Sequence, residues 1–307
     1  MKPPVLLIHH ATNRGYHYPP NSMRGLKTCL DVGARVVETD ISLMGDGEFL
    51  LLHDEILEQG TTGSGPVVAL TADQAMDLYL TWQGAVTEEP VGLLSQALEL
   101  VSCHSQPVEL QLDLKPDAPL DDEILANLVT ALRPVKNRVR VTTGADWALR
   151  RLRALDADLP LGFDPLLYLD ASPHETEENG HPVPPFRKGA YGYWDDHPLA
   201  TRRWGETADY LAARAEALWA QSPPVGIWYI RARLLAQALE DGFDWIAYLH
   251  ARGAQVAAWT LNAERSADVE LAWQLAIVGV DRITTDDAPA LAQALAECPQ
   301  GSIDAEH

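Results

Sequence analysis

Apolar and polar positions form two kinds of segment that alternate along this chain. Short apolar runs, typical of strands buried on both faces of a parallel sheet, are separated by longer segments with the spacing of amphipathic helices. The runs predict strands at residues 5–10, 35–42, 108–114, 139–143, 161–163, 225–230, 255–260 and 281–284. Eight parallel strands that alternate with helices are what a closed TIM-type (β/α)8 barrel requires.

Amphipathic segments fall between and after these strands. They predict helices at residues 22–32, 93–103, 121–132, 145–155, 207–219, 231–251 and 266–276, and a last helix at 288–296 closes the barrel. The 307 residues are enough for one α/β barrel of about 250 residues and an insertion. We therefore expect a single domain over residues 1–307, with residues 297–307 as a flexible tail.

One segment breaks the alternation after the fifth strand. Residues 164–204 are rich in Pro, Gly, His and aromatic residues, among them Tyr168, Tyr191, Tyr193 and Trp194. Its position predicts a long loop over the C-terminal rim of the barrel, where the active sites of such barrels lie. A substrate lid and an ordinary insertion are equally good interpretations of this loop.

Composition and charge narrow the class of protein. A formal charge of -21 argues against a general affinity for nucleic acid or for anionic membrane surfaces. The three cysteines, Cys29, Cys103 and Cys298, are widely spaced and suggest neither a disulfide framework nor a thiolate metal site. The first apolar run, residues 5–8, is too short for a signal-peptide core, and no run approaches a membrane span of about 20 residues. We expect a soluble cytoplasmic protein.

Acidic side chains gather at the ends of two predicted strands. Glu38 and Asp40 are two residues apart, so they project from the same side of their strand, and burying both is costly without a cation between them. Asp113 and Lys115 share a side at the end of the third strand by the same period. Three carboxylates form an oxygen-ligand set for a hard divalent cation, and the lysine can hold a phosphate oxygen.

Histidines lie close to the same strand ends. His9 and His10 end the first strand, and alternation allows only one of them to face the barrel axis. After a tight turn at residues 46–47, residues 48–52 predict a return segment that delivers His53 beside the acidic residues. Two imidazoles can act as the general acid and the general base of phosphodiester cleavage.

The spacing of these residues resembles the signature of the glycerophosphodiester phosphodiesterase family. The matching motifs in the first half are His10, Pro19-Pro20-Asn21-Ser22, Gly33-Ala34, Glu38-Thr39-Asp40, Asp46-Gly47, His53-Asp54 and Thr61-Thr62-Gly63. Further along, the matching residues are Asp113-Leu114-Lys115, Trp259-Thr260-Leu261-Asn262, Asp281, Thr285-Asp286 and Pro289. The motifs span nearly the whole chain, although residues 138–254 carry none.

The resemblance implies a metal-dependent hydrolase of glycerophosphodiesters that yields glycerol phosphate and an alcohol. It implies one divalent cation, Mg²⁺ or Ca²⁺, on three acidic residues, Glu38, Asp40 and Asp113, with His10 and His53 as acid and base. In the mechanism usual for the family, the cation and Lys115 hold the phosphate while the neighbouring glycerol hydroxyl attacks phosphorus, and water then opens the cyclic phosphate. Trp259 is either a wall of the substrate pocket or a core residue.

The chain also departs from the family pattern. The family's His-Arg-Gly is replaced by His9-His10-Ala11-Thr12-Asn13-Arg14-Gly15, so that Arg14 reaches the phosphate from a longer loop or the contact is lost. Either His9 or His10 can be the catalytic histidine, and the distance to Pro19 favours His10. Asp113 stands where the family usually has Glu.

Two other functions compete with this one. The His-x-x-Asn and Asp-Leu-Lys motifs also resemble the related sphingomyelinase D group, so a sphingomyelinase D-like or lysophospholipase D-like enzyme is an alternative. A barrel that has lost catalysis and acts as a binding protein is another, because the family's arginine is missing.

Overall fold

The strands form a closed parallel barrel. The computed structural model describes residues 5–115, 119–170, 177–178, 181–182 and 206–297. The barrel strands are β1 (Leu6–His9), β2 (Val36–Leu43), β6 (Glu109–Leu114), β7 (Val139–Thr143), β8 (Leu161–Phe163), β11 (Ile227–Arg231), β12 (Gln255–Trp259) and β13 (Arg282–Thr285). Each pairs in parallel with its neighbours, and the pairing of β1 with both β13 and β2 closes the ring. The predicted TIM-type barrel is confirmed.

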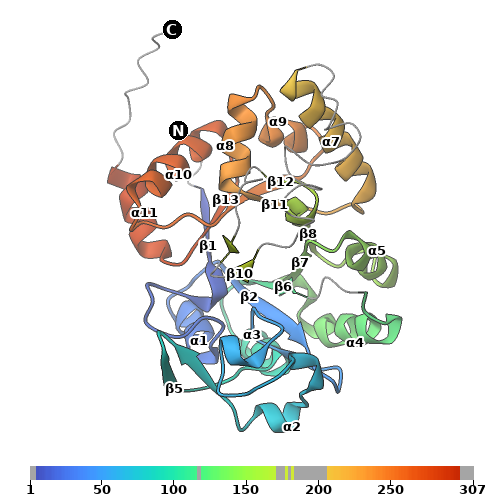
Figure 1. Ribbon diagram of the computed structural model, residues 1–307, viewed down its shortest axis with the longest axis vertical. Helices are drawn as coiled ribbons and strands as arrows, with labels where there is room; N and C mark the ends of the chain where they lie inside the picture. The colour runs from blue at the N-terminus through green and yellow to red at the C-terminus, as the bar shows by residue number, and fades with distance from the viewer. Residues whose placement is uncertain (1–4, 116–118, 171–176, 179–180, 183–205, 298–307) are drawn as a thin grey trace.

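Helices surround the strands (Figure 1). They are α1 (Met23–Asp31), α2 (Ala72–Ala75), α3 (Leu94–Cys103), α4 (Asp122–Leu132), α5 (Asp146–Leu155), α7 (Thr207–Gln221), α8 (Ala232–Glu240), α9 (Trp245–His250), α10 (Ser266–Val278) and α11 (Ala288–Glu297). Short 3-10 helices are η1 (His10–Thr12), η2 (Leu57–Gln59), η3 (Val67–Ala69), η4 (Arg133–Arg138) and η5 (Pro165–Leu167).

The single helix predicted at residues 231–251 is wrong, because two helices, α8 and α9, occupy this stretch. Gly242 adopts a φ of +87°, which ends the first helix in a left-handed conformation that favours glycine. Asp244 then begins the second helix, since its side chain accepts a hydrogen bond from the Ala247 N–H at 2.9 Å.

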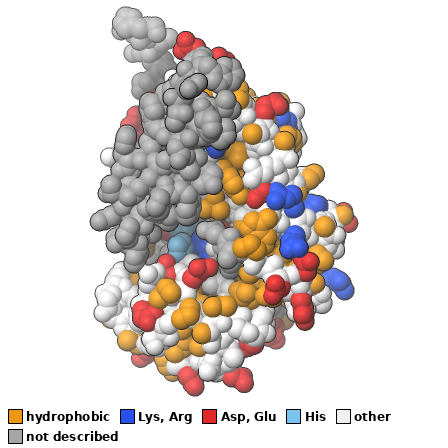
Figure 2. Space-filling view, turned by 45° about the vertical axis from the view of Figure 1, so that its right-hand side comes forward, with side chains coloured by type: hydrophobic (Ala, Val, Ile, Leu, Met, Phe, Trp, Pro, Cys, Tyr) orange, Lys and Arg blue, Asp and Glu red, His pale blue; other side chains and the backbone are white. Residues whose placement is uncertain are grey.

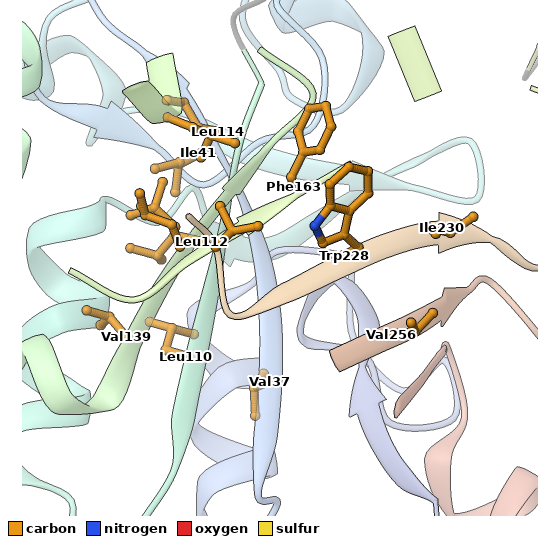
Figure 3. Close-up of a cluster of buried hydrophobic side chains, with 14 of the residues drawn as sticks. Val37, Ile41, Leu110, Leu112, Leu114, Val139, Phe163, Trp228, Ile230 and Val256 are labelled. Atoms are coloured by element: carbon orange, nitrogen blue, oxygen red, sulfur yellow. The ribbon is translucent and has the colours of Figure 1, made fainter. Parts of the chain in front are cut away.

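The core has an outer and an inner layer because strand residues alternate in direction. Val37, Ile41, Leu112, Phe163 and Trp228 belong to the large cluster between strands and helices, part of which Figure 3 shows. A separate cluster fills the barrel itself, and its buried members are Ile8, Val36, Ile227, Tyr229 and Ala257. The alternation that packs the outer layer therefore also points the polar strand-end residues toward the barrel interior.

A charged network lies at the N-terminal end of the barrel, where the strands begin. Glu109 accepts two hydrogen bonds from Arg140, at 3.0 and 3.1 Å, and forms an ion pair of 2.5 Å with Arg282. Arg282 also donates to Gln255 at 3.3 Å. Because these contacts join β6, β7, β12 and β13, the network is a structural feature of the barrel floor.

A small unit not predicted from the sequence lies between β2 and α3. After β3 (Phe49–Leu50), which pairs antiparallel with β2 as the predicted return segment requires, β4 (Tyr79–Trp82) and β5 (Ala85–Pro90) form an antiparallel hairpin. A hydrophobic cluster of its own supports this unit, with Met44, Leu50, Leu52, Leu57, Val67, Ala75, Leu80, Val91 and Leu93 as buried members. Most residues of the hairpin are exposed or half-buried, so no apolar run marks it.

The predicted loop insertion at 164–204 lies largely outside the described residues. Of its chain, residues 164–170 follow β8, and the described pairs Glu177–Glu178 (β9) and His181–Pro182 (β10) form a two-stranded antiparallel ribbon. Tyr191, Tyr193 and Trp194 lie outside the described residues, as do residues 298–307 of the predicted tail. Over the described chain, none of the helices has both the length and the apolarity needed to cross a membrane.

Candidate active site

Three carboxylates meet at the C-terminal ends of β2 and β6. In-register pairing places Asp40 directly beside Asp113, and Glu38 lies two residues earlier on the same face of β2. One oxygen from each of the three side chains lies within 4.8 Å of the other two. Glu38 and Asp40 are almost fully buried, at 3% and 2% exposure, so they share a confined volume. The structure thus brings together all three acids that the sequence predicts as ligands.

Lys115 lies among these carboxylates. Its Nζ atom is 2.8 Å from Asp40 Oδ1 and 2.8 Å from Asp113 Oδ2. Although burial by itself would raise the pKa of Asp40, the ammonium of Lys115 and the charge of His53 hold it well below its usual range. The same carboxylates raise the pKa of Lys115 against the opposing effect of burial, so the lysine stays charged.

Glu38 is the one acid of the three whose negative charge is not paired directly with Lys115. Its Oε2 atom accepts a hydrogen bond of 2.6 Å from the Ala11 N–H. Burial, followed by the negative charge of Asp40, raises the pKa of Glu38 to about 8. A second positive charge in this cluster would relieve that repulsion.

The residues of this cluster fit a hard divalent cation. The donors are carboxylate oxygens, the ligands that Mg²⁺ and Ca²⁺ prefer. Asp40 Oδ1 is buried, and apart from its ion pair with Lys115 it has no hydrogen-bond partner among the described residues, so it has a lone pair to give to a cation. The three carboxylates outnumber the one ammonium among them, that of Lys115, so the cluster has more acidic ligands than the lysine pairs with. The identity of the ion, Mg²⁺ or Ca²⁺, stays a prediction.

The two histidines at the end of β1 face opposite ways. His9 is 6% exposed, and its Nδ1 atom is 3.3 Å from the Asn13 carbonyl oxygen. His10 faces the acidic cluster, with Nε2 4.0 Å from Glu38 Oε2. Burial would lower its pKa, but the hydrogen bond to Asp286 and the charge of Glu38 raise the pKa of His10 to about 9. Geometry therefore favours His10 over His9 as the histidine of the site.

His53 follows β3 at the same end of the barrel. Its side chain is half exposed, and its Nδ1 atom is 3.3 Å from Asp54 Oδ1. Its charge is one of the influences that lower the pKa of Asp40, after that of Lys115. Figure 2 shows the exposed side chains on one face of the molecule, coloured by type. The catalytic role predicted for His53 stays a prediction.

Asp286, to which the sequence analysis assigned no role, holds His10 in place. It follows β13 directly, and its Oδ1 atom is 2.7 Å from His10 Nδ1. Its Oδ2 atom accepts hydrogen bonds from Asn262 Nδ2 at 2.7 Å and from the Tyr16 hydroxyl at 3.2 Å. Asp286 lies one position beyond the end of β13. By the period of two it faces the same side as Arg282 and Thr284, so the rule that singled out Asp40 and Asp113 could also have found it.

Arg14 and Trp259 are the two predicted substrate-binding residues away from the cluster. Arg14 is half-buried, and among the described residues neither a hydrogen bond nor an ion pair joins it to the three acids. The Trp259 ring packs against the inner cluster and lies 5.2 Å from the Arg231 guanidinium. Both interpretations of Trp259, pocket wall and core residue, agree with this position at the end of β12.

Asp164, after β8, is a further acid that the sequence analysis missed. Burial and then the charge of Asp113 raise its pKa to about 7, although the Leu166 N–H donates a hydrogen bond to it at 2.8 Å. The charges of Arg231 and Lys115 oppose that rise. Its strand is only three residues long, so the alternation in sequence was too short to point to it.

The chain is similar in sequence to known phosphodiesterases. A sequence profile of the glycerophosphoryl diester phosphodiesterase family matches residues 14–171. A glycerophosphodiester phosphodiesterase of Caldanaerobacter subterraneus subsp. tengcongensis is 24% identical over 163 residues, which are 52% of this chain and 65% of that protein. Glycerophosphodiester phosphodiesterase 1 of Rattus norvegicus is 22% identical over 251 residues, 80% of this chain and 68% of the relative. The match to the bacterial relative thus spans just under two thirds of its length.

Solved structures share the fold. A putative glycerophosphoryl diester phosphodiesterase from Silicibacter pomeroyi superposes with a TM-score of 0.66 and 20% identity, over 95% of this chain and 93% of the other. An Oleispira antarctica phosphodiesterase, solved in complex with the product sn-glycerol-3-phosphate, superposes with a TM-score of 0.62 and 20% identity, over 96% and 97%. Because the family profile covers just over half of the chain, we conclude that the protein belongs to the glycerophosphoryl diester phosphodiesterase family.

Proposed function

We propose that this protein is a divalent-cation-dependent phosphodiesterase that hydrolyses glycerophosphodiesters to glycerol phosphate and an alcohol. The observation that carries the proposal is the convergence of Glu38, Asp40 and Asp113 on one small volume beside the ammonium of Lys115. The relatives are named for this activity, and the phosphodiesterase from Oleispira antarctica was solved with glycerol phosphate as product.

In this proposal the three acids hold the cation, Mg²⁺ or Ca²⁺. The bound cation would neutralise negative charge on the non-bridging phosphate oxygens. The contacts of the Lys115 ammonium with Asp40 and Asp113 support a role for it in binding a phosphate oxygen beside the cation. Its charge also limits how strongly the three carboxylates repel an anionic substrate.

Two imidazoles would move the protons. His10 presents Nε2 toward the cluster because Asp286 engages Nδ1, so Nε2 is the atom that exchanges a proton with the substrate. His53 lies on a different segment, after β3, and would exchange the other proton. One imidazole removes the proton of the attacking glycerol hydroxyl, and the other donates a proton to the departing alcohol oxygen; addition of water to the resulting cyclic phosphate would then give glycerol phosphate. The half-exposed position of His53 suits the side where the alcohol leaves.

The test is hydrolysis of glycerophosphocholine by the purified protein, followed as release of choline and glycerol phosphate. We expect turnover that EDTA abolishes and that added Mg²⁺ or Ca²⁺ restores. His53→Ala should lower turnover by about 10² to 10⁴ without unfolding the protein. His250→Ala is the matched control, because His250 also lies beside an aspartate, 2.8 Å from Asp281 Oδ2, but at the other end of the barrel. Absence of cation-restored turnover would instead favour a binding protein.

A further inference from the structure

Two asparagines hold two strand-end aspartates by the same set of hydrogen bonds. At the end of β2, Asn21 Oδ1 accepts hydrogen bonds from Thr39 Oγ1 and from the Asp40 N–H, both at 3.0 Å. Asn21 Nδ2 donates to Asp40 Oδ2 at 2.8 Å. Both groups of the amide are therefore engaged by one Thr-Asp pair.

The end of β13 repeats this arrangement atom for atom. Asn262 Oδ1 accepts from Thr285 Oγ1 at 3.1 Å and from the Asp286 N–H at 2.9 Å. Asn262 Nδ2 donates to Asp286 Oδ2 at 2.7 Å. We call each set of Asn, Thr and Asp a clamp, the β2 clamp with Asn21 and the β13 clamp with Asn262.

The two clamps lie on either side of β1. This strand pairs with β13 along its length and with β2 at His9, so the clamps flank the strand that leads directly into His10. The asparagines and threonines of both clamps are almost completely buried, with Asn21 at 2% and Asn262 at 8% exposure. Hydrogen bonds in such positions hold a side chain in one geometry, because water does not compete for them.

In each clamp the amide binds one carboxylate oxygen of the aspartate, and the other oxygen contacts a different residue. In the β2 clamp the remaining oxygen, Asp40 Oδ1, points to Lys115 and the acidic cluster. In the β13 clamp the remaining oxygen, Asp286 Oδ1, is 2.7 Å from His10 Nδ1. The same hydrogen bonds thus aim one carboxylate at the proposed cation and the other at an imidazole.

We propose that Asn21 and Asn262 are positioning residues that share one hydrogen-bond geometry but affect two different properties of the site. The β2 clamp sets the affinity for the cation through Asp40. The β13 clamp sets the rate of the chemical step through Asp286, which fixes the His10 ring with Nε2 toward the substrate. The assignment rests on the proposed function, since it needs a cation and a proton transfer at this site.

A purely structural role makes a different prediction. Both clamps also connect loops to the barrel. If they did only that, removing either clamp would lower the stability of the fold and would change cation affinity and kcat alike. Separate effects of the two clamps on cation affinity and on kcat are therefore the readout that distinguishes positioning from scaffolding.

The experiment compares Asn21→Ala with Asn262→Ala. Calorimetry with Mg²⁺ and with Ca²⁺ should show that Asn21→Ala weakens cation binding by about 10- to 100-fold, the usual effect of an outer-shell partner, whereas Asn262→Ala leaves it unchanged. On glycerophosphocholine at saturating cation, Asn262→Ala should lower kcat by a similar factor with little change in KM. Equal losses in both variants, or no loss in either, would overturn the proposal.

Milder variants keep the test informative if an asparagine variant does not fold. Thr39→Val and Thr285→Val remove one hydroxyl from each clamp. We expect Thr39→Val to weaken cation binding and Thr285→Val to lower kcat, each by less than the corresponding asparagine variant. Thr39→Ser and Thr285→Ser keep the hydroxyl and should restore wild-type behaviour. Thr143→Val is the matched control, because Thr143 also ends a barrel strand and is buried, but its hydroxyl accepts from the Ala145 N–H.

A failure of the proposed function would be recognised separately. If the wild-type protein bound the cation but did not hydrolyse glycerophosphocholine, the proposed substrate would be wrong, and the clamps would still be tested without turnover. Calorimetry reports on the β2 clamp. Long-range ¹H–¹⁵N spectra of the His10 ring report on the β13 clamp, since Asn262→Ala should weaken the hydrogen bond at Nδ1. An unchanged Nδ1 signal would contradict the proposal for this clamp.

Discussion

Lys115→Met tests whether the lysine and the cation neutralise the same carboxylates. The ammonium lies 2.8 Å from both Asp40 and Asp113 and is only 21% exposed. Methionine keeps most of the side-chain volume but removes the charge, which leaves the buried acids to repel one another. In the presence of EDTA the substitution should therefore destabilise the protein.

The size of the effect follows from burial. Removing one partner of a buried ion pair costs about 3–5 kcal/mol, and the partial exposure of Lys115 places the expected loss near the lower limit, at about 3 kcal/mol. For a chain of 307 residues the unfolding entropy is about 0.64 kcal/mol/K, so each kcal/mol lowers Tm by roughly 1.5 °C and Tm should fall by about 5 °C. A divalent cation should shrink this gap below about 2 °C, because it binds among the same carboxylates and replaces the lost charge.

The assay is thermal unfolding of wild type and Lys115→Met, each with EDTA and with saturating Mg²⁺ or Ca²⁺. Lys27→Met is the control, because Lys27 pairs with Asp31 on an exposed helix face and should contribute less than about 1 kcal/mol in either condition. If the difference in Tm between wild type and Lys115→Met were the same with and without cation, the lysine and the cation would not share these ligands.

Three further predictions concern the rest of the barrel. Burial alone would raise the pKa of Glu109, but hydrogen bonds from Arg140 and Arg282 lower this pKa below its ordinary value of 4.5. The ionised Glu109 should therefore stabilise the fold above pH 4.5, and this stabilisation should be lost as the pH falls below 4.5. Denaturant titrations should accordingly show Glu109→Gln losing about 1–3 kcal/mol at pH 7 and much less at pH 3, and an equal loss at both would contradict this sign. Gly242→Ala should lower the free energy of unfolding by about 1–2 kcal/mol through its positive φ, whereas Gly226→Ala, outside the left-handed region, should cost less. Trp259→Ala should raise KM for glycerophosphocholine more than it lowers kcat if the ring is a pocket wall, and equal KM with lower stability would make it a core residue.

Strand positions were predictable because the barrel strands are apolar on both faces. The runs around Val37 and Leu112 stand out in sequence, and the period of two within them is enough to place Glu38, Asp40 and Asp113 on the inward side of their strands. The β4–β5 hairpin escaped prediction since its residues are mainly exposed or half-buried and form no apolar run.

Contacts between distant segments were less accessible to sequence reasoning. The hydrogen bond between His10 and Asp286 joins residues 276 positions apart, and it depends on β1 and β13 closing the barrel. The position of Arg14 depends on the path of the chain through η1, where Ala11 and Thr12 adopt positive φ, and no spacing rule predicts that path. Periodicity predicts which side of a strand a residue faces, whereas closure decides which residues it meets.

The most direct test of the account is calorimetric titration of the EDTA-treated protein with Mg²⁺ and with Ca²⁺, in wild type and in Glu38→Gln. The amide keeps the shape of Glu38 and removes one of the three carboxylate charges. We predict a saturable cation site in wild type whose affinity falls by more than about 100-fold in Glu38→Gln, beyond the effect of an outer-shell partner. Equal affinity in the two proteins would contradict the claim that Glu38, Asp40 and Asp113 hold one cation.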